Sequence, residues 1–524
     1  MEDLPALWLD LGPKTASIRN QWERLLQRRL GESFYGQLRD WCHAHRLALT
    51  GHPAHAGDLS LERYFDIPGQ DVVWRWVAPE NGLALEGVES TQGICASSAM
   101  LHAGKRRNSS ECFGCCGPEG KQWQFGISDM LFYLNWLFVR GCNCIYPHAF
   151  LYSVKEPVQR NDRPPDVGPN NYWWPWEKRI ADYISRCCAL LTDVQARPRV
   201  TILTDGSHLP WELPAELFRR QIGFTYLETE RAEAADIENG ALVVADQHYP
   251  IVVAEDAQVL PAALEQRLSS HGVHVLKTWK STTVAVAEQM DALLPDRTRA
   301  IGERSEQIRI LSRWKEDLLL LFISNEGEEP WQGNIRPERT GYCERLAPWT
   351  GEQTPQGMRD GAIPLKLEYR EAVFLVIDPG REALHAQPET QAEYEEQQLD
   401  QWKVDGRSVT LGDWQQWPGM SLYSGTIAYR TTINRTEVPG RVWLDLGSVK
   451  ELACVEVNGK HCADLLRRPL ICELTEHLHP GENELTVRVT GNFQSRYENK
   501  PCPAGLYGPV RLRTENGHKK ENEH

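Results

Sequence analysis

The segment KRRNSSECFGCCGPEGKQWQFGISDMLFYLNWLFVRGCNCIYPH, from Lys105 to His148, decides the fold of the first part of the chain. Its pattern predicts a strand over 105–110 that ends at Glu111, a helix from Trp123 to Arg140, and a strand over 142–146 that ends at His148. The two strand ends lie about 37 residues apart, which is the length of one strand-plus-helix unit. The segment therefore predicts repeated βα units.

Similar signals stand on both sides of this segment. Amphipathic stretches over 22–45 lead into a short strand over 47–50, which ends at Gly51 and His52, and helices are expected over 91–104 and 177–191. Repeated βα units close into an eight-stranded barrel of roughly 250 residues, whose reactive groups lie at the carboxyl ends of the strands. Residues 1–195 are too short for the whole barrel, so they predict a partial TIM-type barrel.

The remainder of the chain changes pattern three times. The sequence as a whole predicts a multidomain α/β plus β protein. After the partial barrel we expect a small doubly wound, flavodoxin-like α/β domain over 196–290, a β-sandwich over 300–395, an antiparallel sandwich over 396–515 and a disordered tail over 516–524. The short strands 200–203, 241–244 and 251–253 indicate the small α/β domain, and the apolar strand 318–324 indicates the first sandwich.

Composition excludes several classes of function. The chain has 524 residues and a formal net charge of −15 without a basic stripe, which argues against binding to nucleic acid. Its most apolar run, Leu318 to Ile323, is much shorter than the roughly 18 residues that a membrane helix needs, and residues 1–10 lack the pattern of an export signal. We therefore expect a cytoplasmic protein that binds no membrane. The oligomeric state is open.

Cysteine and tryptophan usage add two expectations. The fourteen cysteines include the adjacent pairs Cys115-Cys116 and Cys187-Cys188, which are typical of reduced thiols. The spacing of Cys142 and Cys144 departs from that of zinc sites, so no zinc is expected there. The 19 tryptophans outnumber the 12 phenylalanines, and tryptophan offers a flat apolar face with a polar N–H, which suits a sugar.

At this point the chain resembles a known group of enzymes. The segments Leu49-Thr50-Gly51-His52, Ser110-Glu111-Cys112-Phe113-Gly114 and Pro147-His148-Ala149-Phe150 resemble the later barrel half of large glycoside hydrolases related to family 106, the α-L-rhamnosidases. Further along, Tyr423-Ser424-Gly425, Val457-Asn458-Gly459 and Gly505-Leu506-Tyr507-Gly508-Pro509-Val510 resemble the galactose-binding-like jelly roll of family 2 glycosidases. The order of barrel, small α/β domain and β-domain also resembles family 42 β-galactosidases.

The resemblance implies a glycoside hydrolase that removes a terminal sugar from a plant or microbial glycan, so an oligosaccharide or glycoside is the expected partner. It implies Glu111 as the general base of an inverting mechanism. It also implies a partner acid and a calcium site from an acidic motif upstream of Phe34, and residues 1–33 contain no such strand-ending cluster. Either the chain is part of a longer enzyme, or it is a non-catalytic carbohydrate-binding protein.

The residues themselves also single out Glu111. Glycosidic cleavage usually takes two carboxyl groups, and Glu111 follows a predicted strand directly, so it projects into the mouth of the barrel. Alternatively, Glu111 only favours the first turn of a helix that Ser109 or Ser110 caps. The second carboxylate is not identified. For a retaining galactosidase, Glu80, Glu86 and Glu89 are candidates without an assigned place.

Several other side chains are expected around the sugar. His52, His148 and Asn143 are candidates for hydrogen bonds to its hydroxyl groups, although each histidine could instead be structural. His52 and His55 flank Pro53, so no helix aligns them for zinc. The aromatic residues expected to wall the site, unless they serve packing, are Tyr152, Trp173, Trp174 and Trp176.

Overall fold

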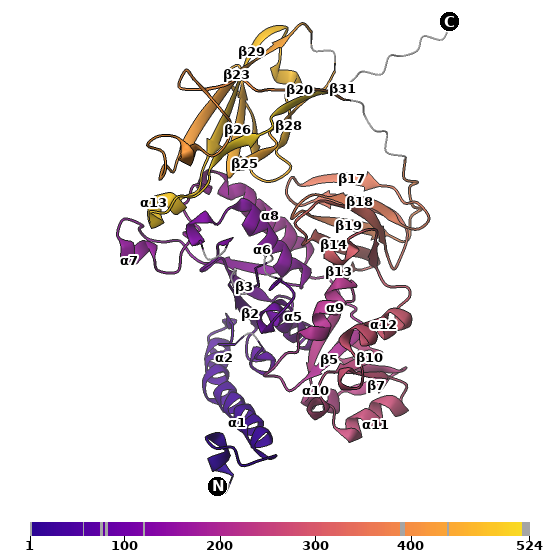
Figure 1. Cartoon of the computed structure of the whole chain (residues 1–524). Helices are drawn as coiled ribbons and strands as arrows, with labels where there is room; N and C mark the ends of the chain where they lie inside the picture. The colour runs from indigo at the N-terminus through magenta and orange to yellow at the C-terminus, as the bar shows by residue number, and fades with distance from the viewer. Residues whose placement is uncertain are drawn as a thin grey trace, which may run out of the picture.

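The computed structural model describes residues 3–55, 57–73, 77–78, 82–118, 121–387, 394–437 and 440–515. The successive parts of the chain stack one upon another, with the N-terminal helices at one end and the last sandwich at the other (Figure 1). The predicted tail over 516–524 and the candidate Glu80 lie outside the described residues. Among the described helices, none combines the length and the apolar composition that a bilayer crossing requires.

A four-stranded parallel sheet forms the first part of the chain, with its strands in sequence order. The strands are β1 (Thr50–Gly51), β2 (Ile67–Val72), β3 (Ser109–Cys112) and β4 (Cys144–Pro147). The main helices beside it are α5 (Gln92–His102), α6 (Ile127–Val139) and α8 (Glu177–Leu190). Short turns of helix complete this part: η1 (Leu4–Leu7), α3 (Leu59–Glu62), η4 (Val88–Thr91), η6 (Gln122–Gln124), α7 (Pro157–Arg160) and η7 (Trp174–Trp176). The predicted parallel βα units are thus confirmed.

Helix α6 shows why this part folds as the sequence suggests. The carboxylate of Asp129 accepts the backbone N–H of Gly126 at 3.1 Å, which closes a cap at the start of the helix. The chain leaves the helix through Gly141, whose φ of +93° favours glycine. Nearly every residue of α6 is buried, so this helix is the centre of the largest apolar cluster.

Strand boundaries differ from the predicted ones. Strand β3 begins at Ser109 rather than Lys105, because the buried Asn108 bonds to the segment before β4. The backbone N–H of Asn108 donates to Asn143 Oδ1 at 3.0 Å, and its Nδ2 donates to the Gly141 carbonyl at 2.7 Å. Strand β1 has two residues only, and the Leu49 N–H preceding it is bound by the Asp66 carboxylate at 2.8 Å.

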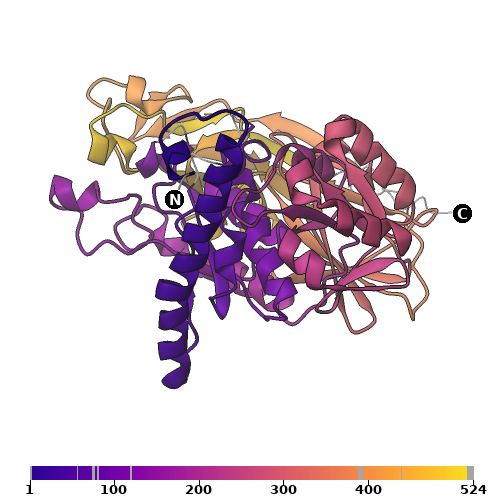
Figure 2. The ribbon, with the colours of Figure 1, turned by 90° about the horizontal axis from the view of Figure 1, so that it is seen from below.

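The predicted amphipathic stretches form one continuous rod. It consists of α1 (Thr15–Leu30), the π-helical turn η2 (Gly31–Tyr35) and α2 (Gly36–Ala44), and it projects from the body of the molecule (Figure 2). The Tyr64 ring lies against Gly31, where an added Cβ would come within 2.5 Å of it. Large apolar side chains on the rod are exposed: Trp22, Leu25, Leu26, Leu30, Phe34, Leu38 and Trp41.

A second parallel sheet follows, in the order β11-β10-β5-β6. Its strands are β5 (Val200–Thr204), β6 (Phe224–Glu228), β10 (Ile251–Ala254) and β11 (His274–Lys277). The helices of this part are α9 (Glu212–Arg219), α10 (Thr229–Ala234), α11 (Ala262–Ser270) and α12 (Thr283–Leu293), with short turns η8 (Ala257–Val259) and η9 (Thr278–Lys280). The strand expected at 241–244 is β8 (Ala241–Val244), which joins β7 (Asp236–Glu238) and β9 (Gln247–Tyr249) in a separate antiparallel sheet.

Two antiparallel sheets come next along the chain. A three-stranded sheet contains β12 (Arg299–Ile301), β15 (Trp331–Arg336) and β18 (Ile363–Leu367). A five-stranded sheet contains β13 (Ile308–Lys315), β14 (Leu318–Asn325), β19 (Ala372–Asp378), β16 (Tyr342–Ala347) and β17 (Glu352–Gln356), and the turn η10 (Ser305–Gln307) precedes it. Strand β14 is buried beyond its first residue, which agrees with its apolar sequence.

The last part consists of further antiparallel sheets. One contains β20 (Tyr394–Gln398), β31 (Arg511–Glu515), β24 (Val442–Asp445) and β28 (Ile471–Glu473). The larger one contains β22 (Arg407–Val409), β21 (Trp402–Val404), β23 (Thr426–Arg435), β29 (Gly481–Thr490), β26 (Leu452–Val457) and β27 (Lys460–Leu465). A pair, β25 (Ser448–Lys450) and β30 (Gly505–Gly508), and the turns η11 (Trp414–Gln416), η12 (Thr475–His477) and α13 (Gln494–Glu498) complete it.

A buried charge cluster joins α6 to the five-stranded sheet. Glu326, which directly follows β14, accepts from Arg140 Nη1 at 2.7 Å and from Arg309 Nε at 2.8 Å. The side chains of all three residues are at least 95% buried. Burial alone would raise the pKa of Glu326, but the two guanidinium groups outweigh it and hold that pKa below its usual value.

Candidate active site

Four polar side chains meet at the carboxyl ends of the four strands of the first sheet. His52 follows β1, Asp71 is near the end of β2, Glu111 is near the end of β3, and His148 follows β4. The register places Asp71 opposite Glu111 in neighbouring parallel strands. Because parallel strands end at one edge of a sheet, consecutive βα units bring these residues together.

Glu111 is the centre of this group. Its Oε2 lies 3.4 Å from His52 Nε2, and its Oε1 lies 3.9 Å from His148 Nε2. About a third of the Glu111 side chain is exposed, at 32%. Oxygen and nitrogen atoms of His52, Asp71 and Glu111 all lie within 4.8 Å of one another. The carboxylate therefore reaches solvent while two imidazoles flank it.

The environment of the group sets its protonation. His52 Nδ1 lies 3.0 Å from the Pro53 carbonyl oxygen, which only accepts, so Nδ1 carries the hydrogen and Nε2 faces Glu111. Burial raises the pKa of Asp71, and the negative charge of Glu111 raises it further. The imidazoles of His52 and His148 and the more distant Arg163 act in the opposite direction and do not cancel this rise.

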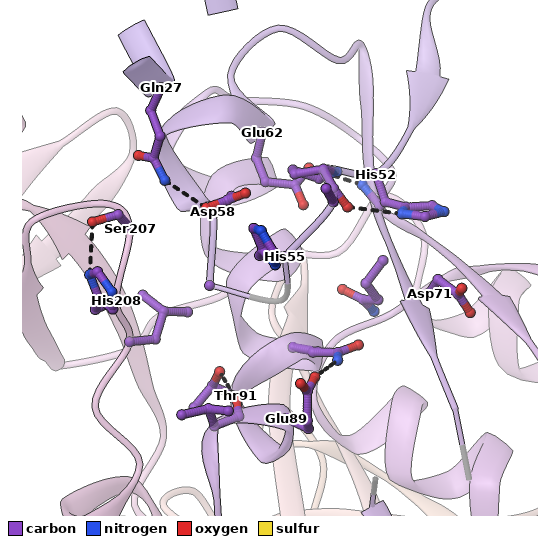
Figure 3. Close-up of a pocket in the computed structure, with 18 of the residues that line it drawn as sticks. Gln27, His52, His55, Asp58, Glu62, Asp71, Glu89, Thr91, Ser207 and His208 are labelled. Carbon is purple, nitrogen blue, oxygen red and sulfur yellow. Dashed lines mark hydrogen bonds between the residues drawn. The ribbon is translucent and has the colours of Figure 1, made fainter. Parts of the chain in front are cut away.

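A cavity of about 680 Å³ opens beside His52 and Asp71. Figure 3 shows these two residues at one end of it and Ser207 and His208 at the other. Its wall also contains Gln27 of α1, Asp58 and Glu62 at α3, and Glu89 and Thr91 of η4. The space is large enough for a sugar and is lined mainly by hydrogen-bonding side chains.

Two carboxyl groups of the wall are buried. Burial raises the pKa of Glu62 well above its usual value, against the effect of the Gly69 N–H that its Oε2 accepts at 3.1 Å. Burial also raises the pKa of Asp58, which accepts from Gln27 Nε2 at 2.6 Å. The large rise at Glu62 favours its neutral acid, which can donate a hydrogen bond as well as accept one, and the shift at Asp58 has the same direction.

Gln70 contributes an unusual group to the cavity wall. Only 5% of this residue is exposed, and neither its Oε1 nor its Nε2 has a hydrogen-bond partner among the described residues. An unpaired buried amide is costly, by about 1–3 kcal/mol. Gln70 immediately precedes Asp71 on β2, so this free carboxamide belongs to the same cavity as the charged group.

The structure does not bring the other predicted residues into this group. Asn143 is buried, and its amide is fully used: Nδ2 donates to the carbonyls of Arg106 and Leu191, and Oδ1 accepts from Asn108 N–H. These bonds tie β3 to β4, which is a structural role in place of the expected contact with a sugar hydroxyl.

The predicted aromatic wall is also displaced from the cavity. The Tyr152 side chain is fully exposed, and Trp173 is 2% exposed within the core. Trp174 packs edge-on against Phe150, with the ring centroids 5.7 Å apart, and together with Trp176 it covers the N-terminal core. Packing against neighbouring side chains accounts for the positions of the three tryptophans, whereas the Tyr152 side chain projects into solvent.

The sequence analysis did not identify Asp71 or Gln70 as site residues. An acidic residue near the end of a strand, in Gly69-Gln70-Asp71-Val72, could have revealed them. However, the strand begins with Ile67-Pro68-Gly69 and lacks the apolar run that usually marks a strand. Of the carboxylates considered for a second role, Glu89 lines the cavity, whereas Glu86 is held by an ion pair to Arg219 at 3.1 Å.

Comparison with known proteins gives a fold relationship. No family model matches the chain. The rhamnosidase from Novosphingobium sp. PP1Y superimposes over 94% of this chain with a TM-score of 0.69, at 20% sequence identity. The chain shares the fold of that rhamnosidase. It spans 56% of the length of the rhamnosidase chain.

Two further comparisons are weaker. A putative beta-glucuronidase of Formosa agariphila is 34% identical over 82 residues, which are 15% of this chain and 7% of that protein. Gan42B, a GH42 beta-galactosidase from G. stearothermophilus, covers 68% of each chain at 9% identity with a TM-score of 0.46, which is too low to support a galactosidase.

The residues at the strand ends do not suit calcium, the ion that the resemblance implies. Calcium takes six to eight oxygen ligands, whereas here an imidazole nitrogen stands beside two carboxylates. The acidic residues expected upstream offer no alternative among the described residues: Glu23 and Glu32 lie on the exposed helical rod, and Asp10 binds Gly12 N–H and Thr15.

Proposed function

We propose that the chain acts in a glycoside hydrolase of the α-L-rhamnosidase type, with Glu111 as the general base. The observation that carries this proposal is the position of the Glu111 carboxylate. It lies at the carboxyl end of β3, partly exposed and flanked by His52 and His148. His52 lines the cavity that can hold a sugar, and Glu111, 3.4 Å from His52, is outside the residues that line it. The shared fold with a rhamnosidase over 94% of the chain supports the substrate class.

In an inverting mechanism, Glu111 removes a proton from water while the water oxygen attacks the anomeric carbon, and a second carboxyl group protonates the departing oxygen. The two carboxyl groups of such enzymes lie about 6.5–9.5 Å apart, which leaves room for the water. Asp71 and Glu111 approach within 4.8 Å. In this mechanism Asp71 is therefore not the proton donor, and a residue outside the group at the strand ends supplies the proton.

The same separation favours a second candidate, a retaining glycosidase. Retaining enzymes place their two carboxyl groups about 5–5.5 Å apart, one of them attacking the sugar and the other first protonating the leaving group. Asp71 and Glu111 come closer to this spacing than to the inverting one. In that case Glu111 is the nucleophile, and Asp71, whose pKa is raised by burial and by the charge of Glu111, is the acid.

The test is release of sugar from an aryl α-L-rhamnoside by the full chain and its variants. Glu111→Gln is expected to lower kcat by about 10²–10⁴-fold, the usual contribution of a general base. Glu86→Gln changes an exposed carboxylate outside the cavity that pairs with Arg219, and it serves as the matched control that is expected to keep its activity. Full activity in Glu111→Gln would overturn the proposal, and so would calorimetry that shows sugar binding to the wild type without turnover.

The anomer of the first product separates the two mechanisms. Proton NMR of the released sugar, recorded before mutarotation, shows inversion if Glu111 acts as base and retention if Glu111 is a nucleophile paired with Asp71. Retention would replace the rhamnosidase-type inverting mechanism by the second candidate.

A further inference from the structure

We propose that His52, Asp71 and Glu111 form a binding site for a divalent transition metal of the zinc class. One donor atom from each residue lies within 4.8 Å of the other two, on three consecutive strand ends. The inference rests on the geometry of these side chains. A metal ion held by Glu111 occupies the carboxylate that the proposed function uses, so bound metal is expected to inhibit hydrolysis through Glu111.

The orientation of His52 is the first argument. Its Nδ1–H is committed to the Pro53 carbonyl at 3.0 Å, so Nε2 is the ring nitrogen that faces Glu111 Oε2, 3.4 Å away. These two atoms attract each other when they share a cation, which is either a proton on Nε2 or a metal ion. Metal-bound histidines commonly donate their other N–H to a backbone carbonyl in this way, which fixes the tautomer.

The second argument is the pairing of two carboxylates. Asp71 and Glu111 occupy directly opposed positions of parallel strands, and both point to the same end of the sheet. A divalent cation offsets the repulsion between them and brings in the imidazole as a third ligand. Donors bound to zinc at about 2.0–2.2 Å lie roughly 3–4 Å from one another, so small rotamer changes close the site.

The chemistry of the donors selects the metal. One imidazole with two carboxylates suits zinc, manganese, cobalt and similar ions, whereas calcium and magnesium prefer oxygen alone. The half-exposed site leaves positions for water or for a substrate oxygen, as catalytic zinc sites do. His148 Nε2, 3.9 Å from Glu111 Oε1, lies on the other side of that carboxylate and is outside the three-residue group.

The experiment is titration of the full, metal-free chain with Co²⁺, followed by absorption spectroscopy and by calorimetry. We expect one equivalent to bind with the weak d–d bands of nitrogen and oxygen ligands, and Zn²⁺ to displace it. His52→Ala and Asp71→Asn are expected to weaken binding by at least about tenfold, because even loss of an outer partner typically costs 10–100-fold. His55→Ala, three residues from His52 but outside the group, is the matched control and should bind as the wild type does.

Three results would overturn the proposal. The first is a failure of the folded wild type to bind Co²⁺ or Zn²⁺. The second is binding that His52→Ala and Asp71→Asn both leave unchanged, or an intense thiolate charge-transfer band, which would place the metal on cysteines. The third is displacement of Co²⁺ by an equal concentration of Ca²⁺. Because spectra and heats report binding directly, an inactive hydrolase does not affect the outcome.

Discussion

Asp71 and Glu111 stand directly opposite each other on β2 and β3, so two carboxylates share one small region at the end of the first sheet. Their charges repel, and the protein folds in spite of this contact. Such a cost is typical of functional sites, where side chains are placed for chemistry at the expense of stability.

Removal of one charge of this pair should therefore stabilise the fold. Asp71→Asn keeps the shape of the side chain but removes its negative charge. Burial and the charge of Glu111 both disfavour that charge. The folded pKa of Asp71 is raised above its unfolded value, so the ionised group weakens the fold at neutral pH and this effect fades as the pH falls toward 4. We expect a higher Tm for Asp71→Asn at pH 7.5 and a smaller gain at pH 5, measured by calorimetry. A lower Tm at pH 7.5 would contradict the argument.

Gln70 offers a second test of whether the residues of this site lower the stability of the fold. Its amide is buried without a partner among the described residues, so Gln70→Met, which keeps the volume, should leave stability unchanged or raise it by up to about 1–3 kcal/mol. Gln27→Met is the contrasting variant, because Gln27 bonds to Asp58 at 2.6 Å and to Ser60 at 3.1 Å, and its loss should destabilise. Urea unfolding measures both. If a sugar uses the free carboxamide, Gln70→Met also weakens its binding.

The buried charge cluster at Glu326 should be essential to stability. Glu326→Gln leaves Arg140 and Arg309 as buried cations without their counterion, and loss of one member of such a cluster costs about 3–5 kcal/mol. The neighbouring Glu328→Gln is the control, since its side chain is exposed and lies 3.8 Å from Arg370, and it should change stability by less than about 0.5 kcal/mol. Equal changes of Tm in the two variants would show that the buried charge cluster stabilises the fold no more than an exposed ion pair does.

Glu451 predicts a loss of stability as the pH rises. Burial, assisted by the charge of Asp129, raises the pKa of Glu451 from 4.5 to about 7. Since the folded state binds the proton more tightly than the unfolded state, the contribution of Glu451 is most favourable below pH 4.5 and declines up to about pH 7. Removing the titration by Glu451→Gln should raise stability above pH 7, by at most about 3 kcal/mol, with a gain that shrinks toward zero as the pH falls to 4.5.

The control for this prediction is Glu482→Gln, an exposed carboxylate of the same part of the chain. Its difference from the wild type should be small and independent of pH. A pH-independent gain in Glu451→Gln would mean that its carboxyl group does not titrate in the predicted range.

Periodic and strand-ending patterns predicted much of the fold. Helices α5 and α8 lie within a few residues of their expected ranges, and the parallel order of the strands ending near Glu111 and His148 is confirmed. Boundaries at β1 and β3 depended instead on long-range hydrogen bonds, such as those that Asp66 accepts from Leu49 N–H and that Asn143 accepts from Asn108 N–H. A strand that begins with Ile67-Pro68-Gly69 carried no clear local signal. The strand at 241–244 was predicted, but its sequence did not show that it pairs with β7 and β9 outside the parallel sheet.

For the candidate site, sequence position predicted which side chains end their strands but not what they face. His52, Glu111 and His148 meet because each ends a consecutive strand. Asn143 also lies at a strand, yet it stands at the beginning of β4 rather than its end, and there the nearest partners are backbone carbonyls. Tyr152 and Trp174 follow β4 by several residues, and the course of such a loop depends on packing that a single sequence does not reveal.

Each of the four polar groups is carried by the end of a separate strand or by the residue after it, and the helices beside the sheet contribute core residues. Evolution, or a protein engineer, can therefore exchange one strand end and retune one group while the other three keep their places. That modularity makes this end of the molecule a natural location for new chemistry on an unchanged framework.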